Sequence, residues 1–173
     1  MRKIFLLFIF IFILISCKKE NNYTVDVSDI EVDLVVNRFD RDFYESSIDD
    51  LPKLKSKYPK FFPESTPDSI WNQKKQNKDE LELYKETKKV FQDFSDIEQQ
   101  LVTLFKHVKL YYPDFETPKV TTVLSNIDYE YRVIYNPSDL IISLDVYLGK
   151  THPFYGDYPG YIKENNTKES ILI

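Results

Sequence analysis

The stretch "SDIEQQLVTLFKHVKLYY", residues 95–112, carries the strongest fold signal in the sequence. Ser95 and Glu98 match the Ser-x-x-Glu capping box, in which each side chain accepts a hydrogen bond from the backbone N–H of the other residue. The apolar residues that follow recur at helical spacing: Ile97, Leu101, Leu104, Phe105, Val108 and Tyr112. This pattern predicts an amphipathic helix over residues 96–112 with one face on the core.

Shorter segments before this helix also have helical patterns. Asp50 can cap a helix with Pro52 in its first turn, and that helix must end before Pro59. One face of it is apolar: Leu51, Leu54 and Tyr58. We expect further helices over residues 67–73, with Trp71 packed inward, and over about 79–93.

The remaining periodicity is that of strands. Residues 30–38, "IEVDLVVNR", alternate apolar and polar side chains and predict one strand. After Pro113, β-branched and aromatic runs flank the turn residues 136–139, which predicts an antiparallel hairpin. The fold class is therefore α+β, helices followed by an antiparallel β-hairpin or sheet. This order also resembles the front half of a zincin-like fold.

The motif "RFDRDF", residues 38–43, brings two carboxylates and two arginines together. Paired carboxylates can perform acid/base catalysis, but an adjacent arginine keeps a carboxylate ionised. We therefore interpret Arg38, Asp40, Arg41 and Asp42 as solvated ion pairs.

The amino terminus has the pattern of an export signal. Arg2 and Lys3 precede twelve unbroken apolar residues, Ile4 to Ile15. A helix of that length reaches only about 18 Å, too short for a hydrocarbon core of about 30 Å. Residues 1–16 are therefore predicted to be a signal peptide. "Leu14-Ile15-Ser16-Cys17" resembles a bacterial lipobox, which makes Cys17, the single cysteine of the chain, the predicted lipid anchor. The alternative is an inert cysteine in a plain signal peptide.

Lipidation of Cys17 would leave the mature chain without a thiol, which excludes disulfides, thiolate zinc sites and cysteine nucleophiles. The lipidated cysteine and a polar tether occupy residues 17–29, and a domain follows over residues 30–173. Removing Arg2 and Lys3 takes the formal net charge from −5 to −7, which argues against binding to nucleic acid.

The chain offers few groups for catalysis or metal binding. It has two histidines, His107 and His152, and no H-E-x-x-H motif. His107 lies at the edge of the apolar face of its helix and is interpreted as a partly exposed structural residue. Asp145 and Asp157, the acids nearest His152, would make a poor site for a first-row metal. We expect no cofactor, no metal and no enzymatic activity.

The stretch "YLGKTHPFYGDYPGY", residues 147–161, contains all three glycines. Gly149 and Gly160 are predicted at positive φ, and the prolines favour extended backbone before them. The aromatic residues are then expected to fold onto the sheet edge as a packed corner: Tyr147, Phe154, Tyr155, Tyr158 and Tyr161. The same five residues are also candidates for a partner-binding surface, and a catalytic loop is the third alternative.

Several blocks occur in an order that resembles a known family. They are "NRFDRDFYE", "LKSKYPKFFPES", "LFKHVKLYYPDFETPKVTTVLSNIDYEYRVIY", "LIISLDVYLGKTHPFY" and "YPGYI". Together they resemble the gliding-motility lipoprotein family GldB over nearly everything after the tether. The resemblance implies a cell-envelope lipoprotein of Bacteroidota that associates with the motility and secretion apparatus. It implies no catalytic residues, and only the lipidated cysteine is carried over, onto Cys17.

In that family, roughly as many residues again follow the glycine stretch. We therefore expect residues 30–173 to be a GldB-like domain truncated at its carboxyl end. Ile171, Leu172 and Ile173 are then expected to expose apolar surface without a partner.

Two functions are compatible with the sequence. The first is an envelope lipoprotein of the gliding and secretion machinery that acts through contacts with other envelope proteins and with the membrane through its lipid. The alternative is a periplasmic lipoprotein that binds a small ligand or a glycan. Because "CKKENN" carries a single acid, Glu20, it matches surface-export signals weakly, and we expect a domain that faces the periplasm.

Overall fold

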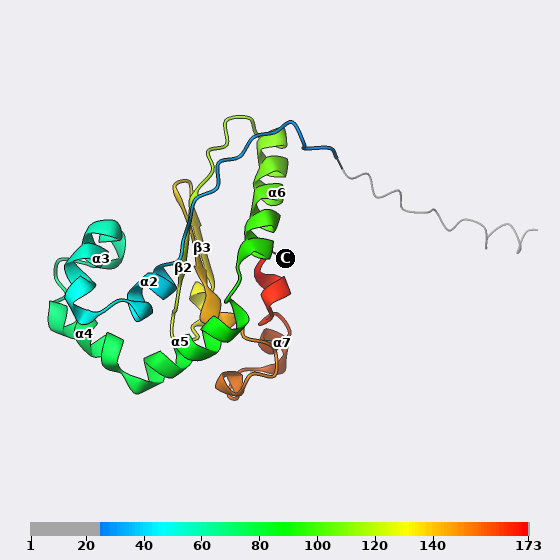
Figure 1. The fold of residues 1–173 in the computed structure, drawn as a ribbon. Coiled ribbons are helices and arrows are strands. Elements are labelled where there is room, and N and C mark those ends of the chain that lie inside the picture. The colour runs from blue at the N-terminus through cyan, green and yellow to red at the C-terminus, as the bar shows by residue number, and fades with distance from the viewer. Residues whose placement is uncertain (1–24, 173) are drawn as a thin grey trace, which may run out of the picture.

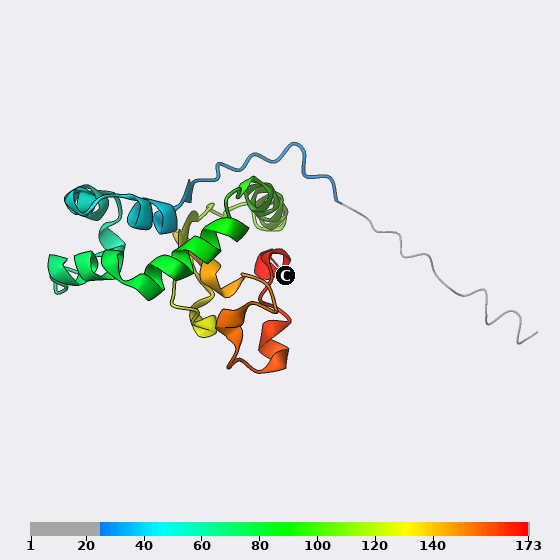
Figure 2. The same ribbon diagram turned by 60° about the horizontal axis from the view of Figure 1, so that its bottom comes forward.

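The computed structural model describes residues 25–172. Its helices are α2 (Phe39–Glu45), α3 (Leu51–Lys57), α4 (Asp68–Gln76), α5 (Lys78–Val90), α6 (Ser95–Tyr111) and α7 (Gly160–Lys163). Its strands are β1 (Val36–Asn37), β2 (Lys119–Val123), β3 (Val133–Asn136) and β4 (Asp139–Ser143). A helical lobe made of α2, α3 and α4 lies on one side of the sheet, and α6, α7 and the last described residues lie on the other (Figures 1 and 2).

The sheet combines parallel and antiparallel pairing. The strand order is β1-β2-β4-β3. The predicted hairpin is confirmed, because β3 and β4 pair antiparallel. The sheet is not antiparallel throughout, because β2 runs parallel to both β1 and β4. Helices α2 to α6 form the long crossover that a parallel β1–β2 pair requires.

The segment before β1 is extended, but only its last two residues form a strand. The predicted strand over residues 30–38 is thus reduced to Val36–Asn37. The preceding backbone instead passes the carboxyl-terminal end of α6, where Lys109 Nζ donates to the carbonyl of Glu31 at 3.0 Å (Figure 1). Val32 and Leu34 pack against the core as their alternation indicated. Lysine side chains therefore replace a neighbouring strand as hydrogen-bond donors to this backbone.

Helix α6 confirms the strongest prediction, with Ile97, Leu101 and Phe105 buried against the core. The capping box is wrong, since the N-cap residue is Phe94 and no side chain caps the helix. The Ser95 N–H instead donates to Asp93 Oδ1 at 2.9 Å. The buried face therefore follows from the spacing of apolar residues alone.

Two apolar clusters hold the fold together. The main cluster lies between the sheet, α5, α6 and the carboxyl-terminal segment, and it includes Phe91, Leu101 and Ile142. A second cluster lies inside the helical lobe and contains Phe43, Leu51, Leu54, Tyr58 and Phe62. The predicted inward packing of Trp71 is confirmed, because its ring contacts Phe62 at a centroid distance of 4.9 Å. The lobe therefore has a core of its own.

The last described residues pack onto the main cluster. Ile171 is 8% exposed and belongs to that cluster, and Leu172 is partly buried against it. The expectation that both would be exposed is wrong, because the 3₁₀ turn Lys168–Leu172 folds back towards α6 (Figure 1). Ile173 lies outside the described residues.

Candidate functional site at the carboxyl ends of the parallel strands

Strands β1, β2 and β4 run in the same direction, so their carboxyl ends meet at one edge of the sheet. The residues that follow these ends include Asp40, Ser125 and Asp145. In sheets with parallel strands this edge is where ligands most often bind. We therefore take this edge and the space beside it as the candidate site.

Asp40 is held in a buried ion pair. Arg38 donates to both of its carboxylate oxygens, from Nε at 3.0 Å and from Nη2 at 2.7 Å, and Thr122 Oγ1 donates to Oδ1. The exposed fraction of the Asp40 side chain is only 1%. The interpretation of this pair as solvated is wrong, because α2 packs against β2 and covers it. A fully paired carboxylate of this kind connects β1, α2 and β2.

The other charges of the "RFDRDF" motif point elsewhere. Asp42 accepts from Lys57 Nζ at 2.5 Å and from the Tyr58 hydroxyl at 2.6 Å. Arg41 donates to the carbonyl of Gln92. Partial burial raises the pKa of Asp42, but the hydrogen bonds from Lys57 and Tyr58 outweigh this, so its pKa lies below the usual value. The carboxylates of Asp40 and Asp42 thus have separate partners and do not act as a pair.

Asp145 is fully buried beneath the loop that follows β2. Its carboxylate accepts from the N–H of Ser125 at 3.0 and 3.1 Å and from the N–H of Ile127 at 2.6 Å. The loop is strained, because Asn126 and Ile127 have φ angles of 60° and 57°. Burial raises the pKa of Asp145, and the hydrogen bonds from Ile127 and Ser125 oppose that shift. Asp145 therefore fixes an unusual backbone conformation at the end of the sheet.

The glycine stretch forms a packed corner around Tyr155. The Tyr155 hydroxyl donates to the carbonyl of Asp145 at 2.6 Å and accepts from the N–H of Leu148 at 2.9 Å. Gly149 has φ 113°, as predicted. The prediction of positive φ for Gly160 is wrong, since Gly160 begins α7. The corner is thus tied to the sheet by a buried tyrosine.

The five aromatic residues proposed for a partner-binding surface have different environments. Tyr147 and Tyr155 are 3% and 0% exposed, so neither can contact a partner. Phe154 and Tyr158 are partly buried against the main cluster. Tyr161 is 76% exposed. The five residues therefore do not form one exposed surface, because Tyr147 and Tyr155 are buried and Phe154 and Tyr158 are partly buried.

The two histidines have structural contacts. His152 Nδ1 accepts from the N–H of Phe154 at 3.3 Å, and its Nε2 lies 3.8 Å from Glu86. His107 is partly exposed, and its Nδ1 lies 2.7 Å from the carbonyl of Thr103. Within residues 25–172, no group of three or more histidine, cysteine, aspartate or glutamate residues is arranged to hold a metal ion.

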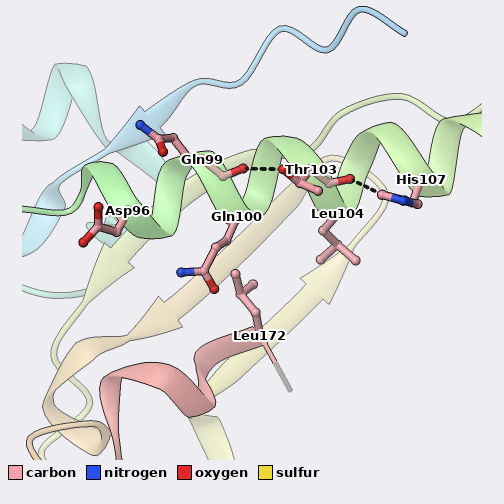
Figure 3. A pocket seen from close by; sticks show the side chains of 7 residues that line it. All are labelled: Asp96, Gln99, Gln100, Thr103, Leu104, His107 and Leu172. Atoms are coloured by element: carbon pink, nitrogen blue, oxygen red, sulfur yellow. Dashed lines mark hydrogen bonds between the residues drawn. The ribbon is translucent and has the colours of Figure 1, made fainter. Parts of the chain in front are cut away.

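A shallow groove runs along α6 beside His107. It is lined by Asp96, Gln99, Gln100, Thr103, Leu104, His107 and Leu172 (Figure 3). The two hydrogen bonds drawn there, from Thr103 to the carbonyl of Gln99 and between His107 and the carbonyl of Thr103, stay within the helix. Its polar residues therefore show no convergent arrangement for a ligand.

A more defined cavity lies between the helical lobe and the sheet, and we call it the aromatic cleft. It has a volume of about 280 Å³. Its lining comes from α2, α4, the 3₁₀ turn Pro59–Phe61, the loop after β2, and both strands of the hairpin. The lining residues are Phe39, Asp40, Phe43, Tyr44, Phe61, Trp71, Lys74, Val123, Leu124, Ser125, Tyr131, Ile134, Ile141 and Ser143. The aromatic cleft thus lies at the carboxyl ends of the parallel strands.

The polar groups of the aromatic cleft are mostly paired. Tyr44 donates to Glu80 Oε2 at 2.5 Å, and Lys74 pairs with Glu80 Oε1 at 2.5 Å. Burial, and then the hydrogen bond to Glu80, raise the pKa of Tyr44 well above its usual value. The exception is Trp71, whose Nε1–H is buried and has no partner among the described residues. The lining of the aromatic cleft is therefore suited to an apolar group.

Sequence reasoning did not find the aromatic cleft. Phe39, Phe61, Trp71 and Ile134 lie on four segments that are far apart in the chain. The aromatic content of the sequence, 16%, is a signal for such a site, but ordinary core positions explain it equally well. Chain folding alone brings these side chains together.

Comparison with family models assigns the chain to a family. The family model of gliding motility protein GldB matches residues 20–173. Searches of curated proteins and of solved structures find no match, so the zincin-like part of the fold expectation has no support. Among residues 25–172, no helix has the length and hydropathy needed to cross a membrane. Because this match covers residues 20–173, the chain belongs to the GldB family of gliding motility lipoproteins.

Proposed function

We propose that this protein works in the cell envelope as a lipoprotein of the gliding machinery and its associated secretion apparatus, through contacts with other envelope proteins. The observation that carries the proposal is the family match over residues 20–173. We assign it no reaction of its own and no nucleic-acid partner. In support, Asp40 and Asp145, the buried carboxylates of the candidate site, are each occupied by internal hydrogen-bond donors.

The membrane attachment in this proposal is the lipid on Cys17, which lies outside the described residues. The matched region begins at residue 20, close to this cysteine. Acyl chains contribute about 0.8 kcal/mol per buried CH₂, so a multiply acylated terminus gives stable attachment. The folded domain would then face the periplasm.

The attachment is tested by Cys17→Ser in the full chain. We expect the variant to lose acyl labelling and to leave the membrane fraction. Protease treatment of intact cells tests the orientation, since a periplasmic domain is protected until the outer membrane is opened. Acyl labelling that persists in the variant would contradict Cys17 as the lipid anchor. Digestion of the domain in intact cells would contradict its periplasmic orientation.

The role in gliding is tested by deletion and complementation. A gliding strain that lacks this gene should stop spreading, and the wild-type gene should restore spreading. The Cys17→Ser variant should not restore it, although its folded domain is intact. Normal gliding of the deletion strain would contradict the proposed function.

A second candidate function is the binding of a small ligand or a glycan, and the aromatic cleft favours it. The rings of Phe39, Phe61 and Trp71 in its lining offer stacking surfaces. A glycan-array screen with the wild-type chain and with Trp71→Phe separates the two functions. Binding that depends on Trp71 would support a ligand, and absence of binding would favour protein contacts.

A further inference from the structure

Strand β3 is an exposed edge of the sheet. It is the last strand in the order β1-β2-β4-β3, and all four of its residues are exposed. Three of them are large and apolar: Val133, Ile134 and Tyr135 are 39%, 40% and 58% exposed. Such an edge usually attracts another chain unless the protein protects it.

The pairing of β3 with β4 defines which backbone groups point outward. Ser143 N–H donates to the carbonyl of Arg132 at 2.9 Å, and Asn136 pairs with Asp139 across a two-residue turn. Pairs alternate along an antiparallel ladder, so Arg132, Ile134 and Asn136 direct their N–H and C=O groups to β4. Val133 and Tyr135 therefore direct two donors and two acceptors away from the sheet.

Among the described residues, the only usual protection of this edge is its short length of four residues. Charged side chains, prolines and bulges are the devices that prevent edge-to-edge pairing. Residues 133–136 are Val-Ile-Tyr-Asn, without charge or proline. The register between β3 and β4 is continuous from Val133 to Asn136, without a bulge. The edge thus keeps both its free backbone groups and its apolar side chains.

The edge is also continuous with the aromatic cleft. Ile134 lines the aromatic cleft and is paired with Ile141, which lines it too. Tyr131, just before β3, is 56% exposed and also lines the aromatic cleft. A chain laid along β3 could therefore place a side chain in the aromatic cleft.

We propose that β3 receives an extended segment of a partner protein, which adds to the sheet as a fifth strand and inserts one apolar side chain into the aromatic cleft. This inference rests on the proposed function through protein contacts. In this mode the main chain supplies affinity and the side-chain pocket supplies selectivity.

Charge and size indicate which kind of chain fits this edge. The four edge residues are uncharged, and Glu130 and Arg132, one of each sign, stand just before them. An uncharged segment is therefore complementary. A second copy fits poorly, because two four-residue edges span only about 13 Å and bury far less than the roughly 1,200 Å² of a stable dimer. Two copies of the chain without Arg2 and Lys3 would also each carry a formal charge of −7.

The test uses a peptide probe on the full chain in mild detergent. Seven-residue peptides displayed on phage are selected against the wild-type chain, and the most enriched peptide is synthesised. Amide hydrogen exchange is then measured by NMR with and without this peptide. We expect the outward amides of Val133 and Tyr135 to become protected, while those of Ile134 and Asn136 are already slow. Failure to enrich any peptide, or protection confined to α6, would overturn the proposal.

Matched variants separate strand addition from simple apolar adhesion. Tyr135→Pro removes an outward N–H, which an edge strand tolerates, whereas Tyr135→Thr keeps it and removes only the ring. We expect Tyr135→Pro to weaken peptide binding about tenfold or more, and N-methylation of alternate peptide residues to have the same effect. In Tyr135→Thr, the amide of residue 135 should still become protected when the peptide binds. Equal binding by the N-methylated peptide would contradict strand addition.

The same variant distinguishes this inference from the proposed function. In a deletion strain that has lost gliding, a folded Tyr135→Pro chain should fail to restore spreading, and Tyr135→Thr should restore it. Full restoration by Tyr135→Pro would overturn the role of the edge and leave the proposed function standing. A deletion strain that glides normally would overturn the proposed function, and the exchange measurement would still decide strand addition.

Discussion

At the scale of single residues, Tyr155 decides whether the glycine stretch is a corner or a surface. Its hydroxyl contacts Asp145 and Leu148 inside the protein, whereas the hydroxyl of Tyr161 belongs to an exposed side chain. Tyr155→Phe leaves a buried carbonyl and a buried N–H without this partner, so we expect a loss of about 1–3 kcal/mol in the free energy of unfolding. Tyr161→Phe is the control and should change it little. Denaturant titration measures the free energy of unfolding of both variants. Equal values for Tyr155→Phe and Tyr161→Phe would contradict the packed corner around Tyr155.

Asp42 provides a test that depends on pH. Because its folded pKa lies below the unfolded value, its ion pair with Lys57 stabilises the protein above the unfolded pKa of about 3.9. This stabilisation is lost as the pH falls through the folded pKa. Asp42 is about one-third exposed, and screening limits the contribution to about 0.5–1 kcal/mol. Wild type should therefore exceed Asp42→Asn in stability at pH 7 and converge with it near pH 2.

Tyr58 supplies a second variant for this measurement. Partial burial and the hydrogen bond to Asp42 raise its pKa to about 12, so it remains a neutral donor across this range. Tyr58→Phe removes one of the two donors to Asp42 and should reduce the pH dependence without abolishing it. A difference between wild type and Asp42→Asn that stays constant from pH 7 to pH 2 would show that the ion pair contributes nothing.

At the scale of elements, the two longest helices begin in different ways. Asn77 Oδ1 accepts from the N–H groups of Asp79 and Glu80 at 2.9 and 3.1 Å and caps α5. Asn77→Ala should cost about 0.5–2 kcal/mol, and Asn77→Asp should restore most of it. Ser95→Ala should cost less than about 0.5 kcal/mol, because the Ser95 side chain does not cap α6. Thermal and chemical unfolding measure the stability of the three variants. A larger loss of stability for Ser95→Ala than for Asn77→Ala would show that the Ser95 side chain does cap α6.

At the scale of the whole molecule, the pair of Arg38 and Asp40 joins the helical lobe to the sheet. Removal of one partner leaves an uncompensated buried charge, so Asp40→Ala should cost about 3–5 kcal/mol. The double variant Arg38→Met with Asp40→Leu should recover much of that loss, because apolar residues can fill the same space. Denaturant titration of both variants measures their free energy of unfolding. A double variant as unstable as Asp40→Ala would show that the ion pair itself is required.

The sequence by itself determined the local elements and the family. Period-3.6 spacing identifies α6 because Ile97, Leu101 and Phe105 occupy one face whatever the rest of the chain does. The turn at residues 136–139 specifies the β3–β4 hairpin, because the two strands are close in sequence and their pairing is also local. The ordered blocks likewise indicated the family that the match over residues 20–173 shows.

Only the tertiary structure decided how distant segments meet. Val36 pairs with Val120 across the entire helical region, and no local pattern specifies whether that pairing is parallel. Contact with β2 buries Asp40, although its neighbouring charges suggested solvated ion pairs. The positive φ angles of Asn126 and Ile127 depend on Asp145, which lies beyond the hairpin. The lining of the aromatic cleft also comes from segments that are far apart in the chain. Burial and cavity shape depend on such long-range packing, whereas periodicity reports only on neighbours along the chain.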